Sequence, residues 1–271
     1  MRTSTNAARV KLYFAFRPVR LVNQKLQYAV VCAANALLCA ASVCGPQDAK
    51  VIPLKAEPHH HLQLHNRYVN VYAVEVAPHD SVILHRHDAD AISVMLGDSE
   101  VTVKSPGKPD IHQKVSGGQL RFQPLGYVHS TSIDGDTTYR NITVELLLPQ
   151  EHARNLCAAV IPRQELNCET PAQHSSGSAK ILVPQLESEQ TTVTLIRILP
   201  HQGIMTGNPA LSELLVALDT VTTSSGADSP SKTLQPGEFR WRDSVSAAQI
   251  LKNESDKESR VVTFELKTSS E

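Results

Sequence analysis

The stretch His85-Arg86-His87-Asp88-Ala89-Asp90, followed by Gly97, concentrates metal-ligating side chains at a spacing that a β-strand can use. Residues two apart on a strand project from the same face, so His85 and His87 are predicted to point two imidazoles into one interior space. Neutral imidazoles are ligands of divalent transition metals. The stretch therefore predicts part of a metal centre inside a β-domain.

A third histidine follows further along the chain, in the stretch Gly118-x5-Pro124-x-Gly126-x2-His129. His129 comes just after a Pro/Gly turn and is flanked by apolar, strand-like sequence. We therefore expect the two stretches to converge on a single site that contains His85, His87 and His129.

The two stretches resemble the sequence motifs of the cupin family, G-x5-H-x-H-x3,4-E-x6-G and G-x5-P-x-G-x2-H-x3-N. The matches to the second motif are Gly118, Pro124, Gly126 and His129, with Ile133 in place of Asn, and those to the first are His85, His87 and Gly97, with Asp90 at the acidic position. The resemblance implies a double-stranded β-helix (jelly-roll-like) barrel in which the histidines and the acid hold a metal.

The sequence departs from the first cupin motif in three places. Position 79 is His rather than Gly, the acidic residue is Asp90 rather than Glu, and only two residues separate it from His87. Asp is one methylene shorter than Glu, and the connecting turn is tighter. Whether Asp90 is a fourth metal ligand beside the three histidines is left open.

A run of histidines, His59-His60-His61, precedes these motifs. Consecutive residues on an extended chain point in alternating directions, so the run does not build one site by itself. It is predicted to be a solvated segment.

Short apolar segments rich in β-branched residues, separated by turns, fill residues 51–148. The longest are 68–77, which ends at Pro78, and 139–148, which ends at Pro149. A sustained 3.6-residue periodicity is lacking there. This part of the chain is therefore predicted to be an all-β sandwich or barrel.

The second half of the chain repeats the first at a period of about 120 residues, which indicates two copies of one domain. The paired segments are 77–81 with 199–203, 92–96 with 214–218, 117–122 with 236–241, and 140–146 with 260–266. The sequence thus predicts two cupin barrels in tandem. Their expected bounds are an N-terminal domain with the metal site at 45–150, a linker with a cysteine pair at 151–180, and a degenerate C-terminal domain at 181–271.

The repeat also provides an internal control on the metal hypothesis. Aligned through Pro78 and Pro200, the positions that correspond to His85, His87 and Asp90 are Gly207, Pro209 and Ser212, and His129 falls near Ala248. If histidines only filled the core of this fold, both copies would be expected to contain some. Their restriction to the first copy favours a metal site there.

Residues 1–44 contain six of the 26 Lys and Arg residues and none of the 27 Asp and Glu residues. A basic region that ends at Lys25 precedes a region rich in apolar and small residues, a composition typical of a cleaved signal peptide. An uncleaved N-terminal membrane anchor is the alternative. The leader predicts export to the periplasm or out of the cell.

Without these residues the chain has 20 basic and 27 acidic residues, a net charge of −7. That balance, with no basic block, argues against binding to nucleic acid or to an anionic membrane surface. The expected partners are a small-molecule ligand or substrate and, as an option, a second copy of the chain in a homodimer. A membrane is expected only through an uncleaved leader.

Cys157 and Cys168 are the two cysteines outside the predicted leader. In an oxidising compartment such an isolated pair is expected to form a local disulfide. Two buried free thiols are the alternative.

Histidines with a carboxylate suit Fe, Mn, Ni, Cu or Zn, and the ligand set does not choose among these divalent metals. The cupin family includes dioxygenases, isomerases, decarboxylases and binding proteins, so two functions stay open. One is an exported metal-dependent enzyme of the dioxygenase or isomerase type that acts on a small molecule, and the other is a non-catalytic small-molecule-binding module. Arg121 and Tyr127, near the second motif, are candidates for substrate contacts, or else packing or surface residues.

Overall fold

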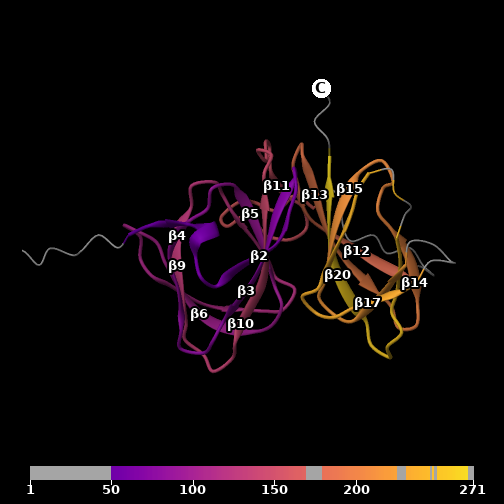
Figure 1. Cartoon of the computed structure of the whole chain (residues 1–271), viewed down its shortest axis with the longest axis horizontal. Helices are drawn as coiled ribbons and strands as arrows, with labels where there is room; N and C mark the ends of the chain where they lie inside the picture. The colour runs from indigo at the N-terminus through magenta and orange to yellow at the C-terminus, as the bar shows by residue number, and fades with distance from the viewer. Residues whose placement is uncertain (1–49, 169–178, 225–229, 245, 247–248, 268–271) are drawn as a thin grey trace, which may run out of the picture. The chain divides into compact units, whose positions relative to one another are not determined.

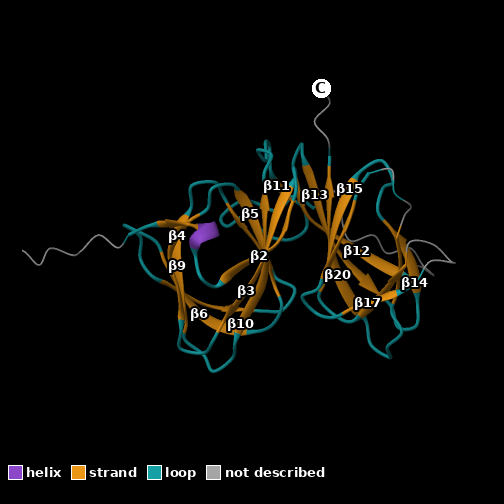
Figure 2. Cartoon of the chain, in the orientation of Figure 1, coloured by secondary structure: helices purple, strands orange, loops and turns teal. Residues whose placement is uncertain are grey.

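The structure is a computed structural model that describes residues 50–168, 179–224, 230–244, 246 and 249–267. The predicted leader, residues 1–44, lies outside this part of the chain. No helix in the described residues is both long and apolar enough to cross a membrane. Their regular structure consists of strands and one 3-10 helix, η1 (Leu54–Ala56), which confirms the predicted all-β class (Figures 1 and 2).

The N-terminal half is built from two five-stranded sheets, with the orders β1-β4-β9-β6-β7 and β2-β3-β10-β5-β8. Its strands are β1 (Ile52–Pro53), β2 (His60–His65), β3 (Val69–Val76), β4 (Ser81–Arg86), β5 (Asp90–Met95), β6 (Ser99–Lys104), β7 (Ile111–Val115), β8 (Leu120–Gln123), β9 (Val128–Ile133) and β10 (Tyr139–Leu146). Neighbouring strands in each sheet are mostly distant in sequence, as expected for a jelly-roll arrangement.

The C-terminal half repeats this plan with a six-stranded sheet, β11-β12-β13-β20-β15-β18, and a four-stranded sheet, β14-β19-β16-β17. Its strands are β11 (Arg154–Asn155), β12 (Lys180–Glu187), β13 (Thr191–Ile198), β14 (Gly203–Thr206), β15 (Ser212–Ala217), β16 (Val221–Ser224), β17 (Lys232–Leu234), β18 (Phe239–Arg242), β19 (Gln249–Lys252) and β20 (Ser259–Leu266). β11 belongs to the predicted linker, yet it pairs with β12 as an edge strand of this half.

Each half buries apolar side chains between its own two sheets. The sheet β2-β3-β10-β5-β8 and the six-stranded sheet also bury their outer faces, in a third cluster to which both halves contribute. The side chains of β3 are divided between two of these clusters, according to the face of the strand from which they project. Val69 and Val71 belong to the shared cluster, whereas Tyr72, Val74 and Val76 belong to the core of the N-terminal half. Because β3 is covered on both sides, its sequence is apolar at most positions.

Two turns show in detail that the halves are copies of each other. His79, between β3 and β4, and His201, between β13 and β14, have positive φ angles of 62° and 57°. Nε2 of His79 lies 3.1 Å from a carboxylate oxygen of Asp136, and Nε2 of His201 lies 2.9 Å from one of Asp256. His79 stands where the cupin motif has Gly. Its positive φ gives the physical reason for Gly at that motif position.

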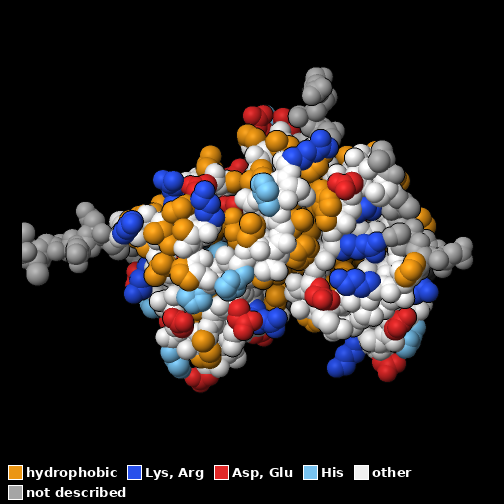
Figure 3. All heavy atoms as spheres, viewed as in Figure 1, with side chains coloured by type: hydrophobic (Ala, Val, Ile, Leu, Met, Phe, Trp, Pro, Cys, Tyr) orange, Lys and Arg blue, Asp and Glu red, His pale blue; other side chains and the backbone are white. Residues whose placement is uncertain are grey.

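Charged side chains of both signs occur over both halves on the face drawn in Figure 3. Exposed ion pairs join some of them, such as Glu100 with Lys114 at 2.6 Å and Arg154 with Glu187 at 2.8 Å. Pairs of this kind contribute about 0–1 kcal/mol each. The stability of the fold therefore rests mainly on the three buried clusters.

Candidate metal centre

β4 carries His85 on the inner face of its sheet because the strand is irregular. Val82 packs in the core and Ile83 is exposed, so strict alternation would point His85 outward. The pairing of β4 with β9 shifts by one residue between Val82 and His85, which reverses the alternation. His85 is consequently buried, with 1% of its surface exposed, and it pairs with His129 on β9.

The Pro/Gly turn of the second motif holds His87, which follows β4 directly. The backbone N–H of His87 donates to the carbonyl of Tyr127 at 3.0 Å, and its carbonyl accepts from the N–H of Gly126 at 2.9 Å. Gly126 has a φ of 81°, a conformation that favours glycine. The turn thus fixes the backbone of His87 and leads into β9, which carries His129.

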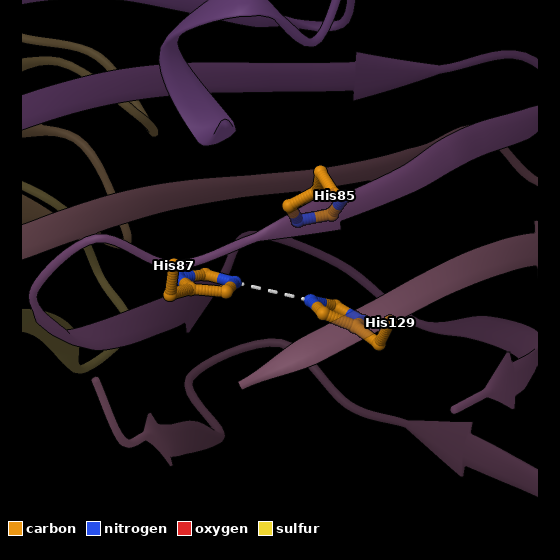
Figure 4. Close-up of side chains that lie close together, drawn as sticks. All are labelled: His85, His87 and His129. Carbon is orange, nitrogen blue, oxygen red and sulfur yellow. Dashed lines mark hydrogen bonds between the residues drawn. The ribbon is translucent and has the colours of Figure 1, made fainter. Parts of the chain in front are cut away.

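The three imidazoles converge in the interior of the N-terminal half (Figure 4). One nitrogen from each of His85, His87 and His129 lies within 4.8 Å of the other two. Nε2 of His87 is 3.1 Å from Nε2 of His129. Nδ1 of His85 donates to the carbonyl of Ile83 at 2.9 Å, which leaves the lone pair on Nε2 facing away from the strand.

Burial keeps these imidazoles neutral. It lowers the pKa of His85 to about 4, with the hydrogen bond to Ile83 acting in the opposite direction. Burial, followed by the neighbouring imidazoles, lowers the pKa of His87 to about 3 and holds the pKa of His129 well below its ordinary value. At neutral pH each ring therefore offers a lone pair, the state in which imidazole binds a metal.

The three side chains fit the predicted cofactor. Nε2 of His85 and Nδ1 of His87 are buried without a hydrogen-bond partner. A buried polar atom left unpaired costs on the order of 1–3 kcal/mol, and a cation on Nε2 of His85 would remove that cost there. Imidazole nitrogens suit a divalent transition metal, whereas Mg²⁺ and Ca²⁺ prefer oxygen ligands. The set does not choose among Fe, Mn, Ni, Cu and Zn.

The structure does not bring Asp90 to the three histidines. Oδ1 of Asp90 accepts from the backbone N–H of Leu125 at 2.9 Å, and Oδ2 accepts from that of Gln150 at 3.2 Å. Asp90 shares a face of β5 with Ile92, which packs in the cluster common to both halves. The opposite face carries Ser93, which lines a small cavity together with His85 and His129. The acidic motif position thus falls on the outer face of β5. There Asp90 connects the loop of Leu125 with that of Gln150 through hydrogen bonds.

A buried acid–imidazole pair that the sequence did not predict lies beside the centre. The ring centroids of His60 and His85 are 5.0 Å apart. Nδ1 of His60 lies 2.6 Å from Oε2 of Glu57, which is 2% exposed. The Glu57 carboxylate also accepts from the backbone N–H groups of His59 at 2.8 Å and Ile83 at 3.2 Å. Burial alone would raise the pKa of Glu57, but the hydrogen bonds from His60 and His59 lower it to about 2.

The prediction of a solvated histidine run was therefore wrong for His60, whose side chain is 6% exposed. His60 begins β2 and lines a polar space of about 10 Å³, which has room for about one water molecule. A buried acid requires hydrogen-bond partners, and the ring of His60, three residues after Glu57, provides one of them.

The strand pairing corrects the alignment of the two copies. β14 pairs with β19 without the shift found in β4, and Thr206 lies opposite Gln249 where His85 lies opposite His129. The counterparts are thus Thr206 and Gln249 rather than Gly207 and Ala248, and Ala248 is outside the described residues. Thr206 and Gln249 are buried, each with one side-chain atom unpaired. The second copy has a different polar interior without these imidazoles.

A buried ion pair occupies part of that interior. Glu213 and Arg242 are 1% and 5% exposed, and their charged atoms lie 3.9 Å apart. Nη2 of Arg242 also donates to the carbonyl of Asn208 at 2.9 Å. Burial raises the pKa of Glu213 to about 7, with Arg242 acting in the opposite direction. These contacts give the second barrel a structural polar core.

Cys157 and Cys168, the cysteines of the predicted disulfide, are thiols in the structure. Cys157 is half-buried and Cys168 is exposed. A hydrogen bond with Cys168 is the main cause of a raised pKa at Cys157, so the two thiols are in contact. The disulfide stays a prediction for an oxidising compartment.

A larger cavity, of about 380 Å³, adjoins the centre at His129. Arg121 and Tyr127, the two candidates for substrate contacts, both line it. Tyr127 stacks on His129 with ring centroids 4.7 Å apart. A small molecule in this cavity would lie beside the imidazole of His129.

No protein-family model matches the sequence, and no curated protein matches it. AerE from Microcystis aeruginosa has a similar structure, with a TM-score of 0.53 and 10% identity over 78% of this chain and 99% of that one. The salicylate 1,2-dioxygenase from Pseudoaminobacter salicylatoxidans has a TM-score of 0.51 and 13% identity, over 73% of this chain and 71% of that one. A cupin 2 conserved barrel domain protein from Leptotrichia buccalis has a TM-score of 0.47 and 10% identity, over 76% and 87%. The likenesses to AerE and to the salicylate 1,2-dioxygenase show the fold, which is the two-barrel cupin fold that the two motifs predicted.

Proposed function

We propose that this protein is an exported metal-binding bicupin whose N-terminal barrel is a metal-dependent enzyme for a small molecule, of the dioxygenase or isomerase type. The observation that carries the proposal is the convergence of three buried, neutral imidazoles beside a cavity of about 380 Å³. When bound, the metal would supply Lewis acidity or dioxygen activation. The second barrel, with Thr206 and Gln249 at the counterpart positions, is proposed to be structural.

The residues of the chain itself would hold and orient the reactants. The carbonyl of Ile83 fixes the ring of His85, so that its Nε2 is the ligand atom. The stacking of Tyr127 on His129 positions the third ring. Apolar side chains in the cavity wall would exclude water from the bound small molecule.

The metal content of protein purified without chelators, followed by calorimetric titration of the stripped protein with each of the five metals, tests the first step. We expect one metal per chain in the wild type and none in His85→Ala/His129→Ala. Oxygen uptake and product analysis across small phenols, diketones and sugars then test catalysis. Wild type that retains no metal after gel filtration would contradict the proposal.

A non-catalytic binding module is the alternative, and one observation favours it. Among the residues that the structure describes, no Asp or Glu that could act as a general base lines the larger cavity. Metal-loaded protein that binds small molecules, with a raised melting temperature, yet converts none of them would support this alternative.

Export is proposed from the composition of residues 1–44, which is basic and then apolar. The intact mass of the protein recovered from the periplasm or medium tests it. A mass that begins near residues 42–46 supports a cleaved signal peptide, and a full-length mass in the membrane fraction supports an anchor.

A further inference from the structure

The larger cavity of the N-terminal barrel has a wall of mixed character. Its apolar part includes Met95, Val101, Val103, Val115, Phe122 and Ile161. Its volume, about 380 Å³, is in the range of small-molecule sites, about 300–1,000 Å³. The space therefore suits a compact organic molecule with an apolar body.

The fully charged side chains of this wall are all cations. They are Lys108, Arg121 and Arg163, and no Asp or Glu of the described ranges lines the cavity. None of the three forms an ion pair with a carboxylate in the part of the chain that the structure describes. Asp110, which is close to Lys108 in sequence, pairs with Lys104 at 3.7 Å. The cavity thus has an excess of positive charge.

Arg121 projects into the barrel on the side of the metal centre. It stands opposite Ser93 in the antiparallel pairing of β8 with β5, and opposite residues in such a pair project from the same face. Ser93 lines the small polar cavity with His85 and His129. Arg121 and His129 both line the larger cavity. The guanidinium and the imidazoles therefore border one continuous interior region.

The third cation comes from the connecting segment, which we define as residues 154–163. Ile161 and Arg163 of this segment line the cavity. The carbonyl of Val160 accepts from the N–H of Phe122 on β8 at 2.7 Å, which fastens the segment to the first barrel. Oδ1 of the fully buried Asn155 accepts from the N–H groups of Val160 and Ile161, both at 2.9 Å. These bonds hold the part of the segment directly before Arg163 against the first barrel.

We propose that this cavity binds a small organic carboxylate, with the carboxylate on the guanidinium of Arg121 and the body of the molecule against the apolar wall. The inference rests on the proposed function, because it names the substrate class of the same site. The planar guanidinium binds a carboxylate through two parallel hydrogen bonds. A half-buried cation without a paired acid is compensated when an anion binds. The apolar wall selects organic carboxylates over inorganic anions.

Calorimetric binding of benzoate and of benzamide, its uncharged counterpart of nearly the same shape, tests this on the full protein stripped of metal. We expect benzoate to bind more tightly than benzamide by about ten-fold or more, which is about 1.4 kcal/mol. Arg121→Gln should bring the ratio close to one, and Arg121→Lys should restore part of it. Arg86→Gln is the matched control, because Arg86 is exposed and pairs with Asp88 at 2.9 Å.

The proposal is overturned if wild type binds both probes equally or does not bind benzoate at millimolar concentrations. It is also overturned if folded Arg121→Gln, checked by its melting temperature, keeps the preference for benzoate. Because the protein is metal-free in this experiment, the outcome is separate from the metal titration. If the protein binds no metal but prefers benzoate to benzamide through Arg121, the carboxylate site is supported and the proposed metal-dependent enzyme is contradicted.

Discussion

Nδ1 of His60 and Oε2 of Glu57 are 2.6 Å apart, and the ring of His60 packs against that of His85. Glu57 follows the 3-10 helix η1, so a segment that precedes the two histidine strands reaches the metal centre. The first barrel thus supports its predicted ligands from a part of the chain outside both cupin motifs.

Glu57→Gln is expected to destabilise the protein by about 1–3 kcal/mol, because a buried amide cannot accept all the hydrogen bonds that the carboxylate accepts. It should also weaken metal affinity, since His60 would no longer hold its place against His85. Urea denaturation and metal titration measure both effects. Glu75→Gln is the control, since Glu75 is exposed. Equal stability of the two variants would contradict a structural role of Glu57.

His85→Ala combined with His87→Ala should abolish stoichiometric metal while the far-UV circular dichroism stays β-rich. The second barrel shows that this fold does not require the imidazoles, because Thr206 and Gln249 occupy the counterpart positions of His85 and His129. Metal at about 100 times its Kd should stabilise wild type by about 2.7 kcal/mol and leave the double variant unchanged. Identical melting of loaded and stripped wild type would count against the centre.

The stability of the metal-free protein should depend on pH through the buried imidazoles. The folded-state pKa values of His85 and His87, about 4 and about 3, lie below the ordinary value of 6.5. The unfolded chain therefore binds more protons as the pH falls below about 6.5. The stability present above that pH is lost until the pH reaches the folded-state values, about 4 for His85 and about 3 for His87. The loss is at most about 1.4 kcal/mol per pH unit for each histidine.

Urea denaturation with EDTA at about pH 5 and about pH 7.5 measures this dependence. His85→Gln with His87→Gln should flatten it, because Gln does not titrate. A wild-type midpoint that is the same at both pH values would show that the histidines are protonated or solvated in the folded protein.

Asp90→Asn is expected to leave the metal stoichiometry unchanged and to reduce stability by about 0.5–1.5 kcal/mol. The Asp90 carboxylate accepts from the N–H groups of Leu125 and Gln150, and an amide would lose one of these bonds. Metal titration and thermal denaturation of the variant distinguish the two roles. A sharp loss of metal affinity with normal stability would place Asp90 at the metal.

Protein recovered from an oxidising compartment should carry a Cys157–Cys168 disulfide, because the two thiols are already in contact. Intact mass after alkylation, with and without prior reduction, measures it. Two alkylated thiols in the unreduced sample would refute the disulfide. Cys157→Ser serves as the control, because it leaves Cys168 without its partner.

The sequence predicted His85 and His87 from their spacing and His129 from the second motif, which specifies the backbone of its turn. Gly126 needs a positive φ, and the turn that it forms holds His87 and starts the strand of His129. The spacing of His85 and His87 also indicated correctly that they share a face. Which face it is depends on the shift between Val82 and His85, and alternation alone gives the wrong answer there.

That same shift explains why other details could not be predicted. It moves the counterpart of His85 in the second copy by one residue, to Thr206. Asp90 was assigned from motif spacing, but its position at the start of β5 points it away from the histidines. The burial of Glu57 and His60 depends on strands that come later in the sequence. A local sequence pattern therefore does not predict it.

The connecting segment belongs to both barrels. It pairs with β12 through β11 at one end, and at the other it places Ile161 and Arg163 in the cavity wall of the first barrel. A version cut after residue 150 would retain all three histidines but would lose one cation and part of the apolar lining. Homologues that differ only in their C-terminal halves could therefore differ in which molecules they admit, without a single change among the histidines.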